Sequence, residues 1–358
     1  MRMKESINCK VILINDRIYG PSVGYPVKSF LEYNGDEKSL YTFIYDKKNI
    51  ALNIEGNKLL GIYPPFTSGW YLNTAFQDII FRKFKNFLKE NSRSSLIHYT
   101  SQQVKPFRVE HSTVTVHDLV PVLFPEQTRT GVLRLTKRNL EFYRTLPVVS
   151  AVSNFTKTTM EVNGFSGKIH VVPNTVSGAF KPLKLDKLEL RKKLNLPPDK
   201  RLILSVSANY PRKNLGIVRK TVELLGREYA LVRVGPSIEG SIVFNNVNEE
   251  TLNEIYNACD VFFTASSYEG FGLPVLEAMS SGIPVVASDI EIFREVTDGA
   301  AILTEINPKF FKRGIEEAIS NKDRFISAGL ERVKHYSFEN FARCAKIFYD
   351  DATSYYGL

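Results

Sequence analysis

The sequence predicts an α/β protein with two domains, each built on a parallel sheet. Three observations predict this class. The 358 residues, 43% of them hydrophobic, exceed what one compact core usually holds. Short apolar runs alternate with helical patterns, which indicates parallel strands joined by helices. The stretch 171–189 contains prolines and little periodicity, so we expect it to link the two halves.

The first half opens with a strand, a loop and a helix. The apolar run 11–14 is the expected strand, DRIYGPSVGYP the loop, and 27–33 the helix. A second strand, 112–117, alternates valines with polar residues until HDLVP ends it. His117 therefore lies near the carboxyl end of a strand.

The alternation continues from a third strand onward. This strand, 147–153, leads into a helix that Ser153 or Asn154 caps and Gly164 ends. The second half repeats the pattern more clearly, with expected strands at 201–208, 229–235, 261–266 and 283–288 and expected helices at 215–226, 249–260 and 273–281. In open α/β sheets the loops after the strands open on one edge, and ligands bind there.

Hydropathy and cysteine usage indicate a cytoplasmic protein. No apolar run approaches the roughly 18 to 20 residues of a membrane-spanning helix, and the first residues, MRMKESINCKVILIN, are too polar for a signal peptide. Cys9, Cys259 and Cys344 lie far apart and form no Cys-x-x-Cys pair. We therefore expect buried thiols in a reducing compartment.

The formal charge of +9 resides in the first half of the chain. Residues 1–180 contain 23 Lys and Arg against 14 Asp and Glu, a difference of 9, whereas residues 181–358 contain 24 of each kind. A basic half indicates an anionic partner, and the charge alone leaves a phosphorylated acceptor, a lipid surface and nucleic acid open.

Residues 266–288 read SSYEGFGLPVLEAMSSGIPVVAS and predict an anion site. Pro274 suits the first position of a helix and Gly282 the position just past its end. The amino end of such a helix carries unpaired N–H groups and a partial positive charge. Gly270 and Gly272 leave the preceding loop bare enough for a ligand to approach those groups.

Two glutamates flank this turn, and they suit hydroxyl groups better than phosphate. A carboxylate beside an anion site is unfavourable unless it accepts hydrogen bonds from neutral donors, so Glu269 and Glu277 fit sugar hydroxyls. Hydroxyls and phosphates together describe a nucleotide sugar. The residues alone leave open a plainer alternative, in which Glu269 is a solvated loop residue and Glu277 a favourable charge near the helix start.

The string EGFGLPVLEAMSSGIPVVAS resembles the Glu-x7-Glu signature of the retaining glycosyltransferases of family 4. VSANYPRKN at 206–214, TVHDLVPVLFPE at 115–126, VSNFTK and KIHVVPNTV, and YSFENFARCAKIFYDD near the end are similar to further motifs of that family. The resemblance covers about residues 110–358. It implies the GT-B fold, with two Rossmann-like domains facing an interdomain cleft.

The resemblance also implies domain boundaries. We expect a basic, acceptor-binding domain at 1–175 and a donor-binding domain at 176–336. Residues 337–358 are expected to form a helix that crosses back onto the first domain. The implied activity is retaining transfer of a hexose, with mannose or glucose favoured, from a nucleoside-diphosphate sugar to a hydroxyl of a glycan or lipid-linked acceptor.

The implied catalytic residues are His117, Arg212, Lys213 and Glu269. In the family the Arg-Lys pair meets the pyrophosphate, the first glutamate meets the transferred sugar, and the histidine approaches the donor sugar near the reacting carbon. Fixed cations at Arg212 and Lys213 can also neutralise charge on a leaving diphosphate. This sequence departs from the family at Ser207, where glycine is usual.

The implied donor-binding residues include Glu277, assigned to the ribose hydroxyls. The others supply amides or a turn near the phosphates and are Gly20, Gly24, Gly270, Phe271, Gly272 and Leu273. For Gly20 and Gly24 a simple turn is an equal alternative, because YGPSVGYP lacks the family's adjacent glycine pair. The sequence contains neither Asp-x-Asp nor a His or Cys cluster with ligand spacing, so we expect no cofactor and metal-independent transfer.

The segment AFQDIIFRKFKNFLKEN, 75–91, predicts a basic amphipathic helix. Its apolar stripe either packs into the core of the first domain or attaches to an anionic membrane surface, which would suit a lipid-linked acceptor. Two rival classes stay open: a non-catalytic nucleotide-sugar-binding protein, and a basic nucleic-acid-binding protein. The second explains neither Glu269 nor Glu277, and no zinc-finger, RRM or KH signature supports it, so we expect no nucleic-acid partner.

Overall fold

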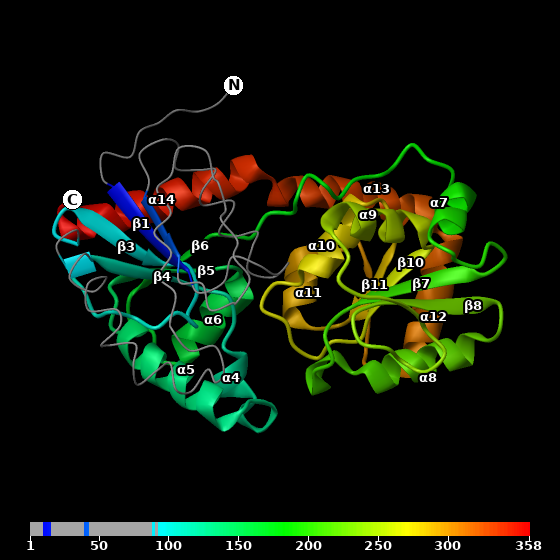
Figure 1. Ribbon diagram of the computed structural model, residues 1–358, viewed down its shortest axis with the longest axis horizontal. Helices are drawn as coiled ribbons and strands as arrows, with labels where there is room; N and C mark the ends of the chain where they lie inside the picture. Colours follow the sequence, from blue (N-terminus) through cyan, green and yellow to red (C-terminus); the bar gives the residue numbers. More distant parts are fainter. Residues whose placement is uncertain (1–9, 16–38, 43–87, 90–91) are drawn as a thin grey trace. The chain divides into compact units, whose positions relative to one another are not determined.

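The computed structural model describes residues 10–15, 39–42, 88–89 and 92–358 (Figure 1). The chain divides into two compact units. Unit 1 comprises Met1–Thr175 and Phe338–Leu358, and unit 2 comprises Val176–Ser337. The boundary after Thr175 falls inside the stretch that the sequence marks as a linker.

Unit 1 contains a parallel sheet whose described strands run in the order β2-β1-β3-β4-β5-β6. All neighbouring pairs are parallel, as expected for strands connected by helices. The strands are β1 (Lys10–Asn15), β2 (Ser39–Thr42), β3 (Ser95–Tyr99), β4 (Ser112–Val116), β5 (Val148–Ala151) and β6 (Lys168–Val171).

Helices cover both faces of this sheet. The helices are α4 (Val120–Leu123), η2 (Pro125–Gln127), α5 (Thr130–Tyr143), α6 (Asn154–Val162) and α14 (Phe338–Tyr356). Ile97 of β3 packs with α5 and α6, whereas the adjacent Leu96 packs with α14. Successive side chains of a strand point to opposite faces, so one strand serves two cores.

Unit 2 repeats the architecture with a sheet in the order β12-β11-β10-β7-β8-β9, again parallel throughout. The strands are β7 (Arg201–Val206), β8 (Tyr229–Val234), β9 (Ile242–Phe244), β10 (Val261–Thr264), β11 (Val285–Ser288) and β12 (Ile302–Thr304). The central strands are buried and rich in Val, Ile, Leu and Phe, as strands covered on both faces usually are.

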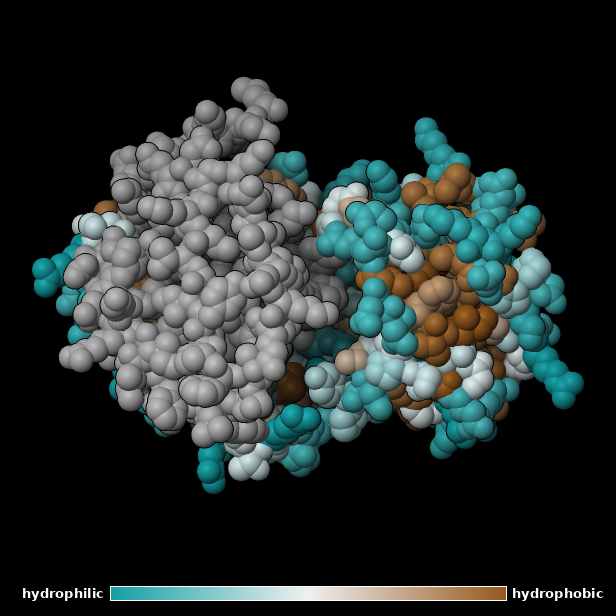
Figure 2. Space-filling view, viewed as in Figure 1, coloured by the Kyte–Doolittle hydropathy of each residue, from teal (hydrophilic) through white to brown (hydrophobic). Residues whose placement is uncertain are grey.

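The helices of unit 2 lie in two layers. They are α7 (Lys187–Lys193), η3 (Pro211–Lys213), α8 (Leu215–Leu225), α9 (Glu249–Ala258), α10 (Leu273–Ser280), α11 (Glu291–Thr297), α12 (Pro308–Ser320), α13 (Lys322–Arg332) and η4 (Val333–Tyr336). Figure 1 shows α8 and α12 on one side of the sheet and α9, α10 and α13 on the other. Figure 2 shows a hydrophilic rim around an apolar centre on the visible face of this unit, over the strands.

The strands and helices predicted for the second half are confirmed, with ends within two residues of those expected. In the first half, Ser153 caps α6 by accepting a hydrogen bond from the Thr156 amide at 3.0 Å. The predicted helix 27–33 lies outside the described residues. Of 75–91 only the buried Leu88 and the exposed Lys89 are described. Every helix in the described ranges is too short or too polar to span a bilayer.

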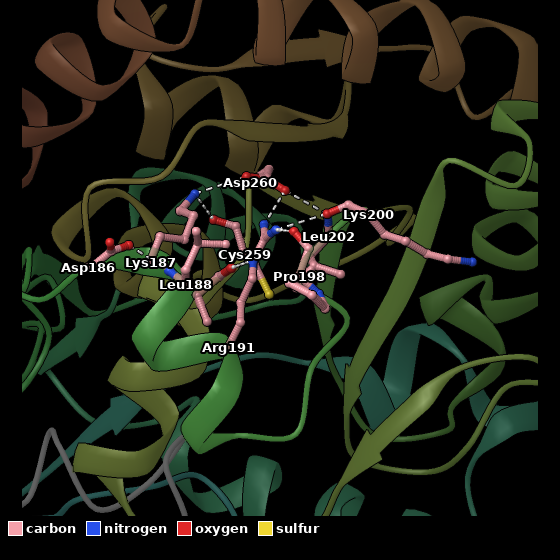
Figure 3. A network of polar contacts seen from close by, with 10 residues as sticks. Asp186, Lys187, Leu188, Arg191, Pro198, Lys200, Leu202, Cys259 and Asp260 are labelled. Atoms are coloured by element: carbon pink, nitrogen blue, oxygen red, sulfur yellow. Dashed lines mark hydrogen bonds and ion pairs between the residues drawn. The ribbon is translucent and has the colours of Figure 1, made fainter.

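A polar network fixes α7 at the amino edge of the sheet of unit 2 (Figure 3). Asp260, directly before β10, accepts hydrogen bonds from Arg191 Nη2 at 2.7 Å, from Lys187 Nζ at 3.0 Å and from the Leu202 amide at 2.7 Å. Arg191 is buried and also donates to the carbonyl oxygen of Ala258. This edge is opposite to the one at which ligands of α/β sheets bind, so we interpret the network as structural.

Candidate functional site

In the sheet of unit 2, the direction in which the chain adds strands reverses between β7 and β10, which is the switch point of this sheet. From β7 the chain first adds β8 and β9 on one side and then adds β10, β11 and β12 on the other. The loops after β7 and β10 therefore leave in opposite directions, and the space beyond their carboxyl ends is where open α/β sheets bind ligands. Six of the predicted site residues lie in the connections that follow these two strands: Arg212, Lys213, Glu269, Gly270, Phe271 and Gly272.

Lys213 and Glu269 form an ion pair across this switch point. Only 13% of the lysine side chain and 17% of the glutamate side chain are exposed, so Glu269 is not the solvated loop residue of the plainer alternative, and Lys213 is equally shielded. The sequence analysis assigned the two residues to different parts of a ligand and did not predict their contact. The pairing offsets the negative charge of Glu269 beside a site that is otherwise suited to anions.

Backbone contacts hold the two loops together around the pair. The Ser267 amide donates to the Arg212 carbonyl oxygen at 2.8 Å, and Asn214 Nδ2 donates to the Ala265 carbonyl oxygen at 2.9 Å. The guanidinium of Arg212 lies 4.6 Å from the centre of the Tyr210 ring. Its Nε is buried and has no hydrogen-bond partner among the described residues.

The loop after β10 ends at Gly272, the N-cap of α10. Gly272 adopts φ +93°, and a Cβ there would lie 2.9 Å from the Phe293 ring, so only glycine fits without a shift. As a glycine it has no side chain to cap the helix, and α10 carries no side-chain cap. Pro274 is the second residue of the helix rather than the first, because α10 begins at Leu273.

Glu277 lies inside the protein on α10, with 2% of its surface exposed. The Tyr256 hydroxyl donates a hydrogen bond to Glu277 Oε2 at 2.9 Å. Burial raises the pKa of Glu277 to about 7, the negative charge of Glu249 acts in the same direction, and the Tyr256 hydrogen bond opposes them. The carboxyl group therefore changes its protonation near neutral pH.

Arg233 is a buried residue beside the site that the sequence analysis missed. It lies on β8 and donates from Nη2 to the Ser207 carbonyl oxygen at 2.8 Å and from Nη1 to Ser207 Oγ at 3.2 Å. Burial lowers the pKa of Arg233 to about 10. The Ser207 hydroxyl, which a glycine would lack, thus accepts a hydrogen bond from Arg233. Together with the bond to the Ser207 carbonyl oxygen, this contact fixes the start of the loop after β7. The available signal was an arginine within the apolar strand YALVRVG.

His117 is the predicted site residue of unit 1 that the structure describes. It follows β4, as expected, and its Nε2 lies 2.8 Å from the Thr100 carbonyl oxygen. Its Nδ1 is buried and has no hydrogen-bond partner among the described residues. Burial lowers the pKa of His117, whereas the hydrogen bond to Thr100 and the charge of Asp118 raise it. Gly20 and Gly24 lie outside the described residues.

Two other histidines of unit 1 are structural. His98 is fully buried between Tyr349 of α14 and Thr115 of β4, with both ring nitrogens 2.8 Å from their partners. His170 lies 2.8 Å from Asp351 of α14. Within the described part of the chain, no group of three or more His, Cys, Asp or Glu residues is arranged to hold a metal ion.

The two units each contain a parallel sheet with six described strands, and the solved structures with which they agree show that the fold is GT-B, a fold of glycosyltransferases. Residues 186–332 match the family model described as "Glycosyl transferases group 1". This match confirms the resemblance to glycosyltransferases inferred from the motifs and covers most of unit 2.

Curated relatives and solved structures agree with this class. The O-antigen chain mannosyltransferase RfbU of Salmonella typhimurium is 27% identical over 65% of this chain and 67% of its own length. The O-antigen chain mannosyltransferase B of Escherichia coli is 27% identical over 66% of this chain and 69% of its own.

Among solved structures, sucrose-phosphate synthase from Thermosynechococcus elongatus has a TM-score of 0.75 at 18% identity, covering 97% of this chain and 100% of that chain. Anabaena Alr3699/HepE in complex with UDP-glucose has a TM-score of 0.73 at 15% identity, covering 96% and 100%. At these identities the likeness concerns the fold.

Proposed function

We propose that the protein is a retaining, metal-independent glycosyltransferase that moves a hexose from a nucleoside-diphosphate sugar to a hydroxyl of a glycan or lipid-linked acceptor. The observation that carries the proposal is the gathering of Lys213, Glu269 and the amino end of α10 around the switch point of unit 2. These groups supply positive charge for a diphosphate and carboxylates for sugar hydroxyls within one loop cluster.

In the proposed reaction, Arg212 and Lys213 stabilise the charge that develops on the departing diphosphate. The amides from Gly270 to Leu273 bind its distal phosphate, since the amino end of a helix attracts anions. These fixed donors can act without a metal. The bond from the anomeric carbon to the phosphate oxygen breaks, the acceptor oxygen attaches on the same face, and the departing phosphate takes the acceptor's proton.

The carboxylates are proposed to orient the donor. Glu277 accepts hydrogen bonds from the ribose hydroxyls, most strongly when it is ionised, and Glu269 accepts from hydroxyls of the transferred sugar. Lys213 then has two roles, because it neutralises Glu269 and faces the diphosphate. His117 is proposed to approach the donor sugar near the reacting carbon.

The names of the relatives suggest which sugar and nucleotide the donor substrate contains. RfbU and the Escherichia coli protein are called mannosyltransferases, which favours mannose and GDP. The HepE complex contains UDP-glucose, so UDP-glucose is the second candidate.

We propose a cytoplasmic enzyme of glycan biosynthesis that makes peripheral contact with an anionic membrane. The basis is α5, which exposes Arg134, Lys137 and Arg138 on unit 1.

Thermal stabilisation by UDP, GDP, UDP-glucose and GDP-mannose tests the proposal, because a ligand that binds only the folded state raises the melting temperature. One nucleotide series is expected to stabilise the chain, and Glu277→Ala is expected to weaken that effect. Lys213→Ala should slow transfer at least tenfold, while the exposed control Lys220→Ala should not. Binding without transfer to any hydroxyl acceptor would favour a non-catalytic nucleotide-sugar-binding protein; no binding would reject the proposal.

The membrane contact has its own test in sedimentation with vesicles at low salt. We expect the protein to pellet with phosphatidylglycerol vesicles and not with phosphatidylcholine vesicles. Arg134→Glu combined with Arg138→Glu should weaken binding roughly tenfold or more, because each basic residue near an anionic surface contributes about 1 kcal/mol. Arg219→Glu, an exposed change on α8, is the control. Equal pelleting of all three proteins would contradict a role for α5.

A further inference from the structure

The side-chain amide of Gln102 forms hydrogen bonds with the backbone of His117 and with that of Asp118. Gln102 lies in the loop after β3 and is 1% exposed. Its Oε1 accepts a hydrogen bond from the His117 amide at 3.0 Å, and its Nε2 donates to the Asp118 carbonyl oxygen at 2.7 Å. One side chain therefore supplies a donor and an acceptor to two consecutive residues. Only a primary amide of this length offers both groups.

The loop that carries Gln102 is itself held from α5. Asn139 is buried, and its Nδ2 lies within hydrogen-bond distance of three successive carbonyl oxygens, at 3.4 Å from Gln102, 3.2 Å from Gln103 and 3.0 Å from Val104. The Tyr143 hydroxyl donates to the Val104 carbonyl oxygen at 2.7 Å. Asn139 and Tyr143 of α5 thus fix the loop that carries Gln102. His117 is therefore positioned, through Gln102, by contacts with a helix.

The same region fixes the tautomer of the imidazole. His117 Nε2 lies 2.8 Å from the Thr100 carbonyl oxygen, which can only accept, so the ring proton resides on Nε2. Nδ1 then presents a lone pair. It is buried and has no hydrogen-bond partner among the described residues. A buried acceptor without a partner is unfavourable, and a hydroxyl of a bound ligand would satisfy it.

We propose that Gln102 is a positioning residue that fixes the backbone of His117 and thereby the orientation of its imidazole. The inference rests on the proposed function and deepens it, since it identifies the residue that orients the histidine assigned to the donor sugar. A merely structural Gln102, tying the loop after β3 to the loop after β4, would affect stability but not the histidine or the rate per folded molecule.

The first test is spectroscopic and does not depend on activity. The full chain is labelled with ¹⁵N-histidine, and the His117 signals are assigned by their absence in His117→Asn. We expect a neutral ring protonated at Nε2 at pH 7. Gln102→Ala should shift or broaden these signals, whereas Gln103→Ala, the same change at the half-buried neighbour, should leave them unchanged. A ring protonated at Nδ1, or signals equally indifferent to both variants, would overturn the proposal.

The second test separates rate from binding, using the donor that the nucleotide series identifies. Gln102→Ala is expected to lower kcat roughly 10- to 100-fold, because a displacement of about 1 Å at a reacting group can cost that much. The Kd of the matching free nucleotide, UDP or GDP, should stay within about twofold, since its proposed ligands lie in unit 2. Gln103→Ala should keep the wild-type kcat, and His117→Asn, which retains an acceptor, should be more active than His117→Phe.

A second variant guards against loss of folding. Gln102→Glu keeps the shape and the acceptor for the His117 amide but sets an oxygen against the Asp118 carbonyl oxygen, so it should lower kcat as well. A wild-type kcat in folded Gln102→Ala and Gln102→Glu proteins would overturn this inference alone. Absence of nucleotide binding would instead reject the proposed function, and the ¹⁵N spectra would still decide the state of His117.

Discussion

Glu277 is a residue for which stability and ligand binding have opposite requirements. Its burial favours the neutral carboxylic acid, whereas the proposed binding of ribose hydroxyls favours the ionised carboxylate, which accepts at both oxygens. The Tyr256 hydrogen bond favours the ionised form and partly offsets the burial. Such a conflict is typical of residues retained for function rather than for stability.

The conflict predicts a pH-dependent effect of Glu277→Gln on stability. The pKa of about 7 in the folded protein exceeds the ordinary value of 4.5. The folded state therefore binds more protons than the unfolded state between these values, and the stability contributed by Glu277 is lost as the pH rises through 7. Glutamine does not titrate, so the melting temperature of the variant relative to wild type should increase from pH 5 to pH 8.

Each pKa unit corresponds to about 1.4 kcal/mol, so the total change is on the order of 3 kcal/mol. Thermal melts at pH 5, 6, 7 and 8 without nucleotide measure it. Glu223→Gln, whose side chain is 58% exposed, serves as the control for the same substitution at the surface. A constant difference between Glu277→Gln and wild type across this range would contradict the raised pKa.

Gly272 illustrates a second residue-scale requirement, that of backbone conformation. Gly272→Ala should destabilise the protein by roughly 1–3 kcal/mol, because it combines φ +93° with a Cβ only 2.9 Å from Phe293. Gly216→Ala is the matched control: no atom lies within 4 Å of its added Cβ, its φ is ordinary, and it lies in α8, so it should stabilise by about 0.5–1 kcal/mol. Urea denaturation measures both, and a loss no larger at 272 than at 216 would contradict the requirement.

At this scale the sequence predicted which residues lie beyond the carboxyl ends of β7 and β10 but not how they pair. Pro274 and the glycines around it indicated a helix start without any long-range information. The Lys213–Glu269 ion pair joins residues separated by 56 positions, and Arg233 binds Ser207 from a neighbouring strand. These contacts follow from strand order, which a list of motifs does not contain.

At the scale of elements, the sequence indicated the strands of unit 2 that are continuous apolar runs, but not β3 of unit 1, whose five buried residues, SLIHY, include a serine and a histidine. β7, β8, β10 and β11 were all predicted, since runs of Val, Ile, Leu and Phe bounded by turn residues are typical of central parallel strands. β9 and β12 were not: each has three half-buried residues, too few to show a period. α5 was not predicted either, although its sequence TGVLRLTKRNLEFY has an amphipathic helical pattern.

The polar network around Asp260 that holds α7 against the sheet, here called the α7 clamp, gives the prediction at this scale. Asp260→Asn should destabilise unit 2 by about 3 kcal/mol, because it leaves the buried Arg191 cation without its charged partner. Asp350→Asn, which breaks an exposed pair on α14, should cost less than about 1 kcal/mol. Urea denaturation measures both changes.

Measuring nucleotide affinity tests whether the α7 clamp is independent of the candidate site. The clamp lies at the amino edge of the sheet and the site at the carboxyl edge. The folded Asp260→Asn protein should therefore bind UDP or GDP as wild type does. A large loss of affinity at unchanged stability would mean that Asp260 belongs to the ligand site.

At the scale of the whole molecule, the chain crosses between the units twice. It leaves unit 1 after Thr175, builds unit 2, and returns at Phe338 as α14. That helix contributes five buried side chains to the second core of unit 1: Phe341, Ala345, Phe348, Tyr349 and Ala352. The last residues therefore belong to the first unit, and unit 1 cannot complete its core until the whole sequence is present.

This topology predicts that α14 stabilises unit 1 through its buried face alone. Phe348→Ala removes a fully buried ring that contacts His98 and Tyr349, and it should destabilise unit 1 by about 3–5 kcal/mol. Ile347→Ala, one position earlier on the same helix and 51% exposed, should cost less than about 1 kcal/mol. Because the core of unit 2 is formed by its own residues, limited proteolysis of Phe348→Ala should cut unit 1 first and leave a resistant fragment that begins near Val176. Equal losses from the two substitutions, or simultaneous digestion of both units, would show instead that α14 acts on the molecule as a whole.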